Sequence, residues 1–127
     1  MIKYIHAKTL LDFHEDQINQ YGGNRGVRDK KLLNLALEHS EKSNGEVRSG
    51  VFKIAAAYGA NISRAKPFFD GYNRIALIAV YTFLYVNGKQ LKAANKDLCR
   101  AILQLSKGKL GVDEFAGFLE ENSLPRN

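Results

Sequence analysis

The longest apolar stretch of the chain is the feature that most constrains its fold. It covers residues 75–86 (IALIAVYTFLYV), is interrupted only by Thr82, and is followed at once by Asn87 and Gly88. A helix of this length extends ~18 Å, well short of the ~30 Å hydrocarbon core of a bilayer. Because almost no polar face is left, the stretch predicts a buried central helix over about residues 73–87, ended by Gly88.

Five further segments are predicted to be helical, because their apolar residues recur at helical spacing between capping residues and glycines. Thr9, Asp29 and Asn95 are the expected caps of three of them. The second helix is expected to fade into a polar loop at Ser40–Gly45. The segments are residues 10–21, 30–40, 49–64, 95–107 and 112–122. The prediction is an all-α fold, a compact six-helix bundle forming a single domain over residues 1–127.

Strands play no part in this prediction. Two candidates, residues 3–6 and 89–92, are too short to carry a sheet, and Pro125 is expected to end the ordered chain. Cys99 is the single cysteine, which excludes an intramolecular disulfide and suits a reducing compartment. Residues 1–15 contain no apolar run typical of a secretory signal, so a cytoplasmic protein without a membrane segment is predicted.

The charge balance favours acidic partners. The chain has 19 basic and 13 acidic residues, hence a net charge of +6. Nucleic acid, nucleotide phosphates or an acidic protein segment would all fit, and so would a basic surface that only aids solubility. The lysines are scattered over several predicted helices without a recognition motif. A basic nucleic-acid-binding module is therefore the alternative that the sequence favours least.

Residues suited to chemistry gather between the third and fourth predicted helices. In chain order they are Arg64, Lys66, Phe68, Asp70, Gly71, Asn73 and Arg74. Such a loop leads into a helix N-terminus, where unpaired N–H groups and the helix dipole attract anions. Arg74 in the first helical turn opposes that dipole, an effect that a bound phosphate would offset. Asp70, the only carboxylate nearby, would hold Mg²⁺ against phosphate oxygens.

The same residues are also compatible with an ordinary turn between helices. Pro67 disfavours a helical conformation at Lys66, and Asp70-Gly71 is a common turn pair. Asp70 would then cap the next helix, and Arg74 would pair with a carboxylate. Residue chemistry alone leaves both interpretations open.

The segment 66–76 (KPFFDGYNRIA) resembles the Fic/Doc motif, written H-P-F-x-[DE]-G-N-[GK]-R-x-A. Residues 16–37 (DQINQYGGNRGVRDKKLLNLAL) resemble the N-terminal region of the short, Doc-type (death-on-curing) branch. The central helix with its Asn87-Gly88 stop and the final helix around Phe115 also fit. The resemblance therefore extends over nearly the whole chain.

This resemblance implies an all-helical toxin component of a toxin–antitoxin module with a transferase fold. Such proteins move AMP (AMPylation) or a phosphoryl group (kinase activity) from a nucleotide onto a target hydroxyl. Doc toxins phosphorylate elongation factor Tu, and a Phd-type antitoxin neutralises them with a helical segment. The implied cofactor is ATP or another nucleotide with Mg²⁺. We expect the antitoxin helix near the first and fourth helices and the Gly22-Gly23 loop.

The motif also implies a role for each matching position. Asp70 would bind the metal, Gly71 would let backbone approach phosphate, and Arg74 would bind phosphate oxygens. Phe68 would be the buried anchor of the loop. Arg64 matches a basic residue of the Doc branch that assists phosphate binding.

Three positions depart from the motif. Lys66 stands at the histidine, Tyr72 at the asparagine, and Asn73 at the lysine or glycine. The histidine acts as a base with a pKa of ~6.5, whereas an ordinary lysine, at ~10.4, stays charged. Lys66 would accept a proton only with a strongly lowered pKa, but a cationic Lys66 would bind phosphate directly. Tyr72 would stack on a base or fill the pocket.

Three interpretations follow. The first is a degenerate member with little or no transfer activity that still binds nucleotide, an antitoxin or a target. The second is an enzyme with altered chemistry. The third is a chain in which the histidine was replaced deliberately, or selected away because the active toxin kills its host. Other reactive residues have simpler explanations. His14 is expected to be a hydrogen-bonded core or partner-groove residue, and Cys99 a small packing residue.

Overall fold

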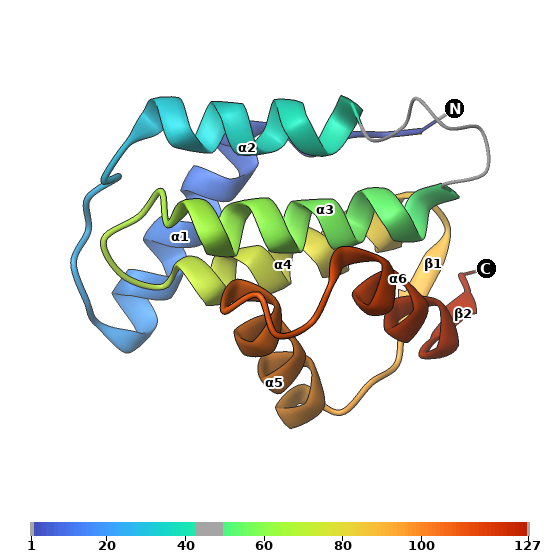
Figure 1. Ribbon diagram of the computed structural model, residues 1–127. Coiled ribbons are helices and arrows are strands. Elements are labelled where there is room, and N and C mark those ends of the chain that lie inside the picture. The colour runs from blue at the N-terminus through green and yellow to red at the C-terminus, as the bar shows by residue number, and fades with distance from the viewer. Residues whose placement is uncertain (1, 43–49, 127) are drawn as a thin grey trace.

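A computed structural model describes residues 2–42 and 50–126, and within them the all-α prediction is confirmed. Figure 1 shows the six helices of this part of the chain. They are α1 (Ala7–Tyr21), α2 (Lys30–Lys42), α3 (Gly50–Ala65), α4 (Tyr72–Val86), α5 (Asn95–Ser106) and α6 (Val112–Glu121). The second helix continues past Ser40, where a loop was expected. The rest of that loop and the expected start of the third helix at residue 49 lie outside the described residues.

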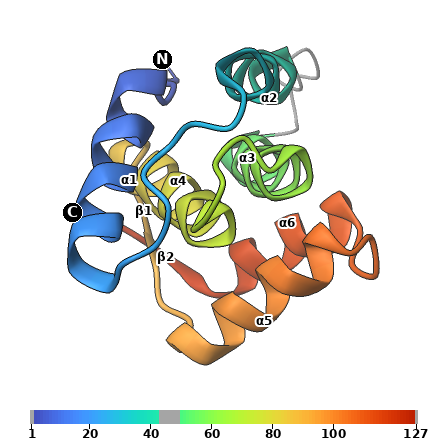
Figure 2. The ribbon, with the colours of Figure 1, turned by 90° about the vertical axis from the view of Figure 1, so that its left-hand side faces the viewer.

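The core lies between α3 and α4, which run side by side in both ribbon views (Figures 1 and 2). The apolar α4 buries Ile75, Val80 and Phe83 completely. The alanine-rich α3 contacts α2, α4, α5 and α6, so it shares the central place predicted for α4. A Cβ on Gly59 of α3 would lie only 3.1–3.4 Å from side chains of α4, α5 and α6. Small residues are therefore what allow these helices to approach.

The helix caps show where the local sequence was sufficient to predict the start of a helix. Asp29 caps α2 as predicted, because its Oδ1 accepts hydrogen bonds from the backbone N–H groups of Lys31 (3.0 Å) and Leu32 (3.2 Å). The other two expected caps are wrong. α1 begins earlier, with His6 in place of Thr9 at the N-cap, and α5 has Ala94 in place of Asn95. Neither His6 nor Ala94 makes a side-chain capping bond.

A small sheet corrects the expectation about strands. β1 (Lys89–Leu91) pairs antiparallel with β2 (Ser123–Pro125), and Gln90 lies opposite Leu124. Pro125 therefore lies within a strand and does not end the ordered chain. The signal was missed because each strand has three residues and its partner lies far away in sequence. Within the described residues, no helix has the length and hydropathy that a membrane span requires.

The segment between α1 and α2 runs back across the loop that precedes α4 (Figure 2). The Pro67 carbonyl accepts hydrogen bonds from the backbone N–H groups of Arg28 (2.7 Å) and Asp29 (3.1 Å). The Arg28 side chain donates to the carbonyls of Lys66 (2.7 Å) and Ala65 (2.9 Å). These bonds join two distant parts of the chain and set the position of the functional loop.

Candidate functional site

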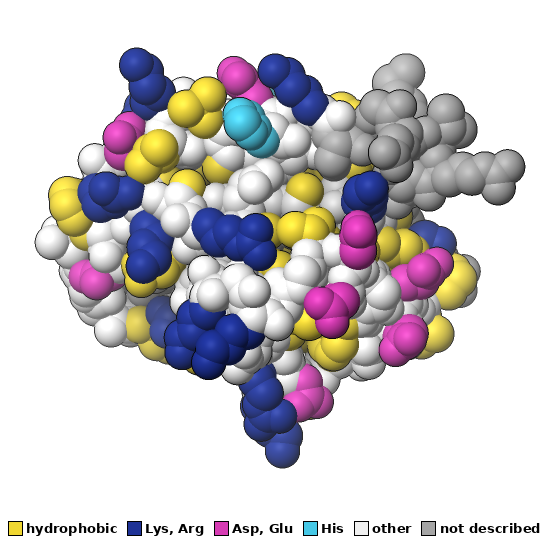
Figure 3. Space-filling view, viewed as in Figure 1, with side chains coloured by type: hydrophobic (Ala, Val, Ile, Leu, Met, Phe, Trp, Pro, Cys, Tyr) yellow, Lys and Arg dark blue, Asp and Glu magenta, His cyan; other side chains and the backbone are white. Residues whose placement is uncertain are grey.

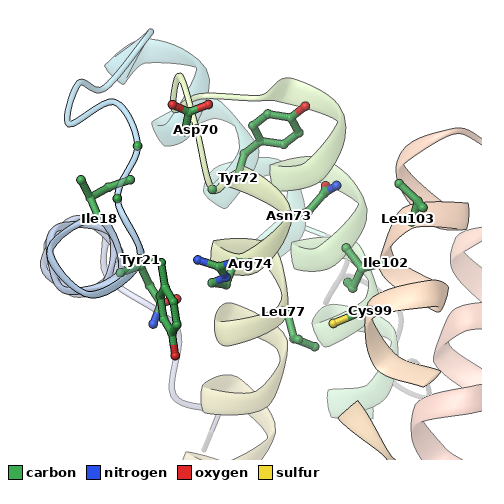
Figure 4. Close-up of a pocket in the computed structure, with 14 residues that line it drawn as sticks. Ile18, Tyr21, Asp70, Tyr72, Asn73, Arg74, Leu77, Cys99, Ile102 and Leu103 are labelled. Atoms are coloured by element: carbon green, nitrogen blue, oxygen red, sulfur yellow. The ribbon is translucent and has the colours of Figure 1, made fainter. Parts of the chain in front are cut away.

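A cavity of about 740 Å³ opens where the N-terminal end of α4 meets the end of α1 and one side of α5 (Figure 4). Its wall combines the loop before α4 with two other helices. The lining residues are Gln17, Ile18, Tyr21, Gly22, Gly23, Asp70, Gly71, Tyr72, Asn73, Arg74, Leu77, Cys99, Ile102 and Leu103. Five of the residues expected from the motif, at positions 70–74, are therefore brought together.

The backbone of the loop leaves the start of α4 open. Gly71 is the N-cap, with a left-handed φ of 76°, and within the described residues no side chain caps the helix. Asp70, which would cap the helix in an ordinary turn, is not the N-cap, and Asn73 lies inside the first turn. The first N–H groups of a helix have no partner within it. In α4 they are thus available, next to the cavity, for an anion.

Asp70 is held from two sides. Its Oδ2 accepts a hydrogen bond from the backbone N–H of Asn24 (2.7 Å), and its backbone carbonyl lies 2.9 Å from Nε2 of His14. Gly23 packs against it closely, because an added Cβ there would lie 3.4 Å from the Asp70 side chain and 3.1 Å from Ile18. The glycine pair of the α1–α2 loop thereby makes room for the carboxylate.

Arg74 is exposed and lies against α1. Its guanidinium carbon is 4.6 Å from the centre of the Tyr21 ring, a cation–π contact that Figure 4 shows beside the cavity. Across residues 2–42 and 50–126 no carboxylate forms an ion pair with this guanidinium, so the pairing expected of an ordinary turn is not found there. Its charge is free to meet an anion.

The two bulky departures from the motif contact each other. Nζ of Lys66 lies 5.6 Å from the centre of the Tyr72 ring. Tyr72 lines the cavity, whereas Lys66 does not. Lys66 has a left-handed φ of 50°, which is uncommon outside glycine, and directly follows the end of α3. The Lys66 side chain extends over the Tyr72 ring.

Arg64 and Phe68 lie outside the cavity wall. Nε of Arg64 donates to the carbonyl of Leu105 (3.0 Å), near the C-terminal end of α5, where a cation is electrostatically favourable. Phe68 points inward as expected, with 1% of its surface exposed. Its ring stacks on His14, with the two ring centres 4.1 Å apart.

Asn73 faces α5, on the opposite side of α4 from Arg74 (Figure 4). Its buried Oδ1 has no hydrogen-bond partner among the described residues, and neither has the buried Oε1 of Gln17. An unpaired buried acceptor is costly. Both amides belong to residues that line the cavity.

Several wall residues were not expected from the sequence. Cys99 was expected to be a packing residue, but its side chain is exposed and lines the cavity. Gln17 and Leu103 join the site only because α1 and α5 flank α4, and no local motif marks them. His14 is a hydrogen-bonded, nearly fully buried residue as predicted, with 3% of its surface exposed. Its contact with Asp70 was not anticipated.

A helical scaffold, an uncapped helix start and a motif loop at its cavity together describe a known class of protein. The chain belongs to the Fic/DOC family, whose model matches residues 4–84, from before α1 to near the end of α4. It is also similar to Toxin Doc of Mycolicibacterium smegmatis, with 35% identity over 83 residues. That alignment covers 64% of this chain and 63% of the relative.

Proposed function

We propose that this protein is a Doc-like toxin of a toxin–antitoxin module, with the fold of a nucleotide-dependent protein-modifying transferase. The group transferred would be a phosphoryl group or AMP, and the acceptor a hydroxyl of a translation factor such as elongation factor Tu. The observation that carries the proposal is the convergence of Asp70, the uncapped start of α4 and Arg74 on one cavity. Such a target implies action in the cytoplasm.

Nucleotide with Mg²⁺ fits the donor groups of the cavity. Mg²⁺ at nucleotide sites is bound through one or two carboxylates together with phosphate oxygens and waters. Asp70 supplies one carboxylate, and no cluster of three or more His, Cys, Asp or Glu exists among the described residues to hold a metal unaided. Asp70 would therefore bind the metal as a complex with nucleotide. The ion would offset charge on the phosphate that is transferred.

Arg74 and the first N–H groups of α4 would bind the phosphates. The guanidinium is a planar donor suited to two phosphate oxygens, and its stacking on Tyr21 restricts its orientation. The N–H groups point along the helix axis towards the same region. Together they would stabilise negative charge without a large rearrangement of the side chains.

Lys66 is the reason to expect lost or altered activity. A lysine ammonium has no lone pair with which to accept a proton from a target hydroxyl, whereas a neutral imidazole at the same position has one. In this protein the Lys66 ammonium lies over the Tyr72 ring. Phosphoryl transfer depends chiefly on positioning and charge stabilisation, so slow transfer without a base is physically reasonable. We expect the unmodified protein to be much slower than its Lys66→His variant.

A labelling assay tests this function. The protein and Lys66→His would be incubated with cell extract, Mg²⁺ and ATP labelled at either the α- or the γ-phosphate. Label on a target from both proteins, faster with Lys66→His, supports the proposal, and the labelled position separates AMP transfer from phosphorylation. Label with Lys66→His alone indicates a dormant site. No label with either protein contradicts transfer and favours a binding protein that retains the fold.

Binding without catalysis is the second candidate, and the exposed face of α4 favours it. Arg74, Leu77, Tyr81 and Tyr85 follow one another at helical spacing, and the two tyrosines are 41% and 42% exposed. This face extends about 16 Å, long enough for three turns of a partner helix. We propose that it receives the helical segment of a Phd-type antitoxin.

Co-expression with the antitoxin encoded next to this protein tests that interface. Tyr81→Glu should abolish co-purification, because it places a charge in the centre of the apolar face. Leu35→Glu is the matched control, since Leu35 is equally exposed (42%) but lies on α2. Equal loss with both variants would contradict this location.

Charge distribution argues against nucleic acid as the ligand. On the face of the molecule drawn in Figure 3, Lys and Arg side chains are spread out, while acidic side chains gather towards α6. Helix α6 by itself carries four exposed acidic residues, Asp113, Glu114, Glu120 and Glu121. A nucleic-acid surface needs a continuous basic stripe, so binding that falls steeply with salt would be required to revive this alternative.

A further inference from the structure

His14 occupies an unusual place for a buried polar residue. It lies on α1 with 3% of its surface exposed, and its ring is parallel to Phe68, with an interplanar angle of 16°. Nε2 is 2.9 Å from the backbone carbonyl oxygen of Asp70, which lies 56 residues further along the chain. A carbonyl oxygen only accepts hydrogen bonds, so Nε2 must carry the hydrogen.

This bond acts on a weakly constrained part of the backbone. Asp70 lies just before Gly71, which has a left-handed backbone conformation. Most residues adopt this conformation only with strain, whereas glycine has large conformational freedom. A Cβ at Gly71 would lie 3.9 Å from Cδ2 of His14, so the imidazole is in close proximity to the turn itself. The ring thus restrains the peptide that follows Asp70.

The same face of α1 also reaches Arg74. His14, Ile18 and Tyr21 are spaced at i, i+4 and i+7, so they lie on one side of the helix. Tyr21 contacts the Arg74 guanidinium, while His14 contacts the Asp70 carbonyl. One helix therefore contacts the Arg74 guanidinium directly and Asp70 through its backbone carbonyl, although both residues belong to a different segment.

We propose that His14 is a positioning residue, which sets the backbone of Asp70 so that the carboxylate faces the metal and nucleotide. This inference rests on the proposed function, in which Asp70 holds Mg²⁺. The His14 hydrogen bond orients Asp70 through its main chain, and the Asn24 N–H orients it through its side chain. Partners of this kind, one step removed from a metal, typically change metal affinity ~10- to 100-fold when lost.

Two variants separate the hydrogen bond from the ring. His14→Gln retains an N–H donor at the position of Nε2 but loses the stacked ring. His14→Phe retains an aromatic ring against Phe68 but cannot donate. His39→Phe is the matched control, because His39 is exposed on α2. Thermal unfolding of all three identifies any variant that does not fold.

The first measurement needs no ligand. Nitrogen NMR of the wild-type protein should show His14 protonated at Nε2, and the Gly71 amide nitrogen should shift in His14→Phe but much less in His14→Gln. An Nε2 without hydrogen overturns the inference, and so does a Gly71 signal that is unchanged in His14→Phe. Because the tautomer is read on the wild-type protein, a variant that fails to fold does not prevent a decision.

The second measurement is the affinity of each protein for Mn²⁺ with ATP. We expect His14→Phe to bind about 10-fold more weakly, with His14→Gln within about threefold of wild type and His39→Phe unchanged. Equal affinity in all variants overturns the positioning role. If wild-type protein does not bind Mn²⁺–ATP at all, the proposed function fails, while the NMR result still decides whether His14 holds Asp70.

Discussion

The two ends of α4 are built in opposite ways. At the C-terminal end, Asn87 exchanges two hydrogen bonds with the backbone of Lys3 (both 2.9 Å) and donates a third to the Phe83 carbonyl (2.8 Å). The Gly88 carbonyl accepts from the Arg126 N–H (2.8 Å). At the N-terminal end, Gly71 supplies no side-chain cap, and Arg74 stands where the dipole disfavours a cation. Hydrogen bonds within the chain satisfy the C-terminal end of α4, whereas its N-terminal end is left open to a ligand.

The largest effect is expected from Arg74→Ala. Loss of the guanidinium should reduce transfer or Mn²⁺–ATP binding ~100-fold, because a preorganised donor to phosphate is removed. Thermal stability should not fall, since the variant also removes an unfavourable charge from the start of α4. Arg126→Ala, at the C-terminal end of α4, is the control. It removes the side-chain hydrogen bond to the Tyr85 carbonyl (2.7 Å) and the contact with the Tyr85 ring (4.4 Å), so it should lower stability and leave binding unchanged. A drop in stability with Arg74→Ala would break the comparison.

Alanine at the two glycines after α1 should distinguish strain from contact. Gly22 and Gly23 both have positive φ, 81° and 119°, so each substitution should cost about 1–3 kcal/mol of folding free energy. Only a Cβ on Gly23 meets Asp70 and Ile18, whereas nothing lies within 4 Å of one on Gly22. Gly23→Ala should therefore also weaken Mn²⁺–ATP binding. Isothermal titration checks this, and equal affinities would remove Gly23 from the site.

Asn87→Ala should destabilise the protein without affecting the cavity. Three hydrogen bonds are lost at a partly exposed position, for which about 1–2 kcal/mol is reasonable. Urea unfolding measures the loss, and Mn²⁺–ATP affinity should stay at the wild-type value. Reduced affinity in folded protein would mean that the two ends of α4 are coupled.

The smallest expected effect is on the pH dependence of stability, through the contact between Glu41 of α2 and Tyr58 of α3. Burial raises the pKa of Glu41 above its usual range, although the hydroxyl of Tyr58 opposes this shift by donating to it (3.5 Å). The folded protein then binds the proton more tightly than the unfolded chain, so this contribution to stability is present at low pH and is lost as pH rises through the raised value.

Glu41→Gln should remove that pH dependence and raise stability slightly at neutral pH, by little because solvent screens a partly exposed carboxylate. Melting temperatures of wild type and variant between pH 4 and pH 7 measure it, with the exposed Glu15→Gln on α1 as control. Identical curves for Glu41→Gln and wild type would show that Glu41 is effectively solvated.

Structural features that depend only on neighbouring residues in the sequence were predicted best. Asp29 was identified correctly as a cap because its bonds reach only two and three residues ahead. The caps expected at Thr9 and Asn95 were wrong, because both residues lie inside the first turn of their helices. The β1–β2 pair was missed because strands of three residues have almost no pattern of their own. A helix cap can thus be predicted from sequence only where tertiary contacts do not override the local preference.

Within the site, sequence determined that the segment 64–74 joins two helices and carries a carboxylate, a glycine and cations, because those are properties of contiguous residues. Only the tertiary structure decided which of them meet. The Lys66 side chain lies over the Tyr72 ring and is not part of the cavity wall, and Arg64 bonds to α5. The contacts of Asp70 and Arg74 with α1 depend on how distant helices pack. Helical periodicity is local, whereas a site is formed by long-range contacts that no single segment encodes.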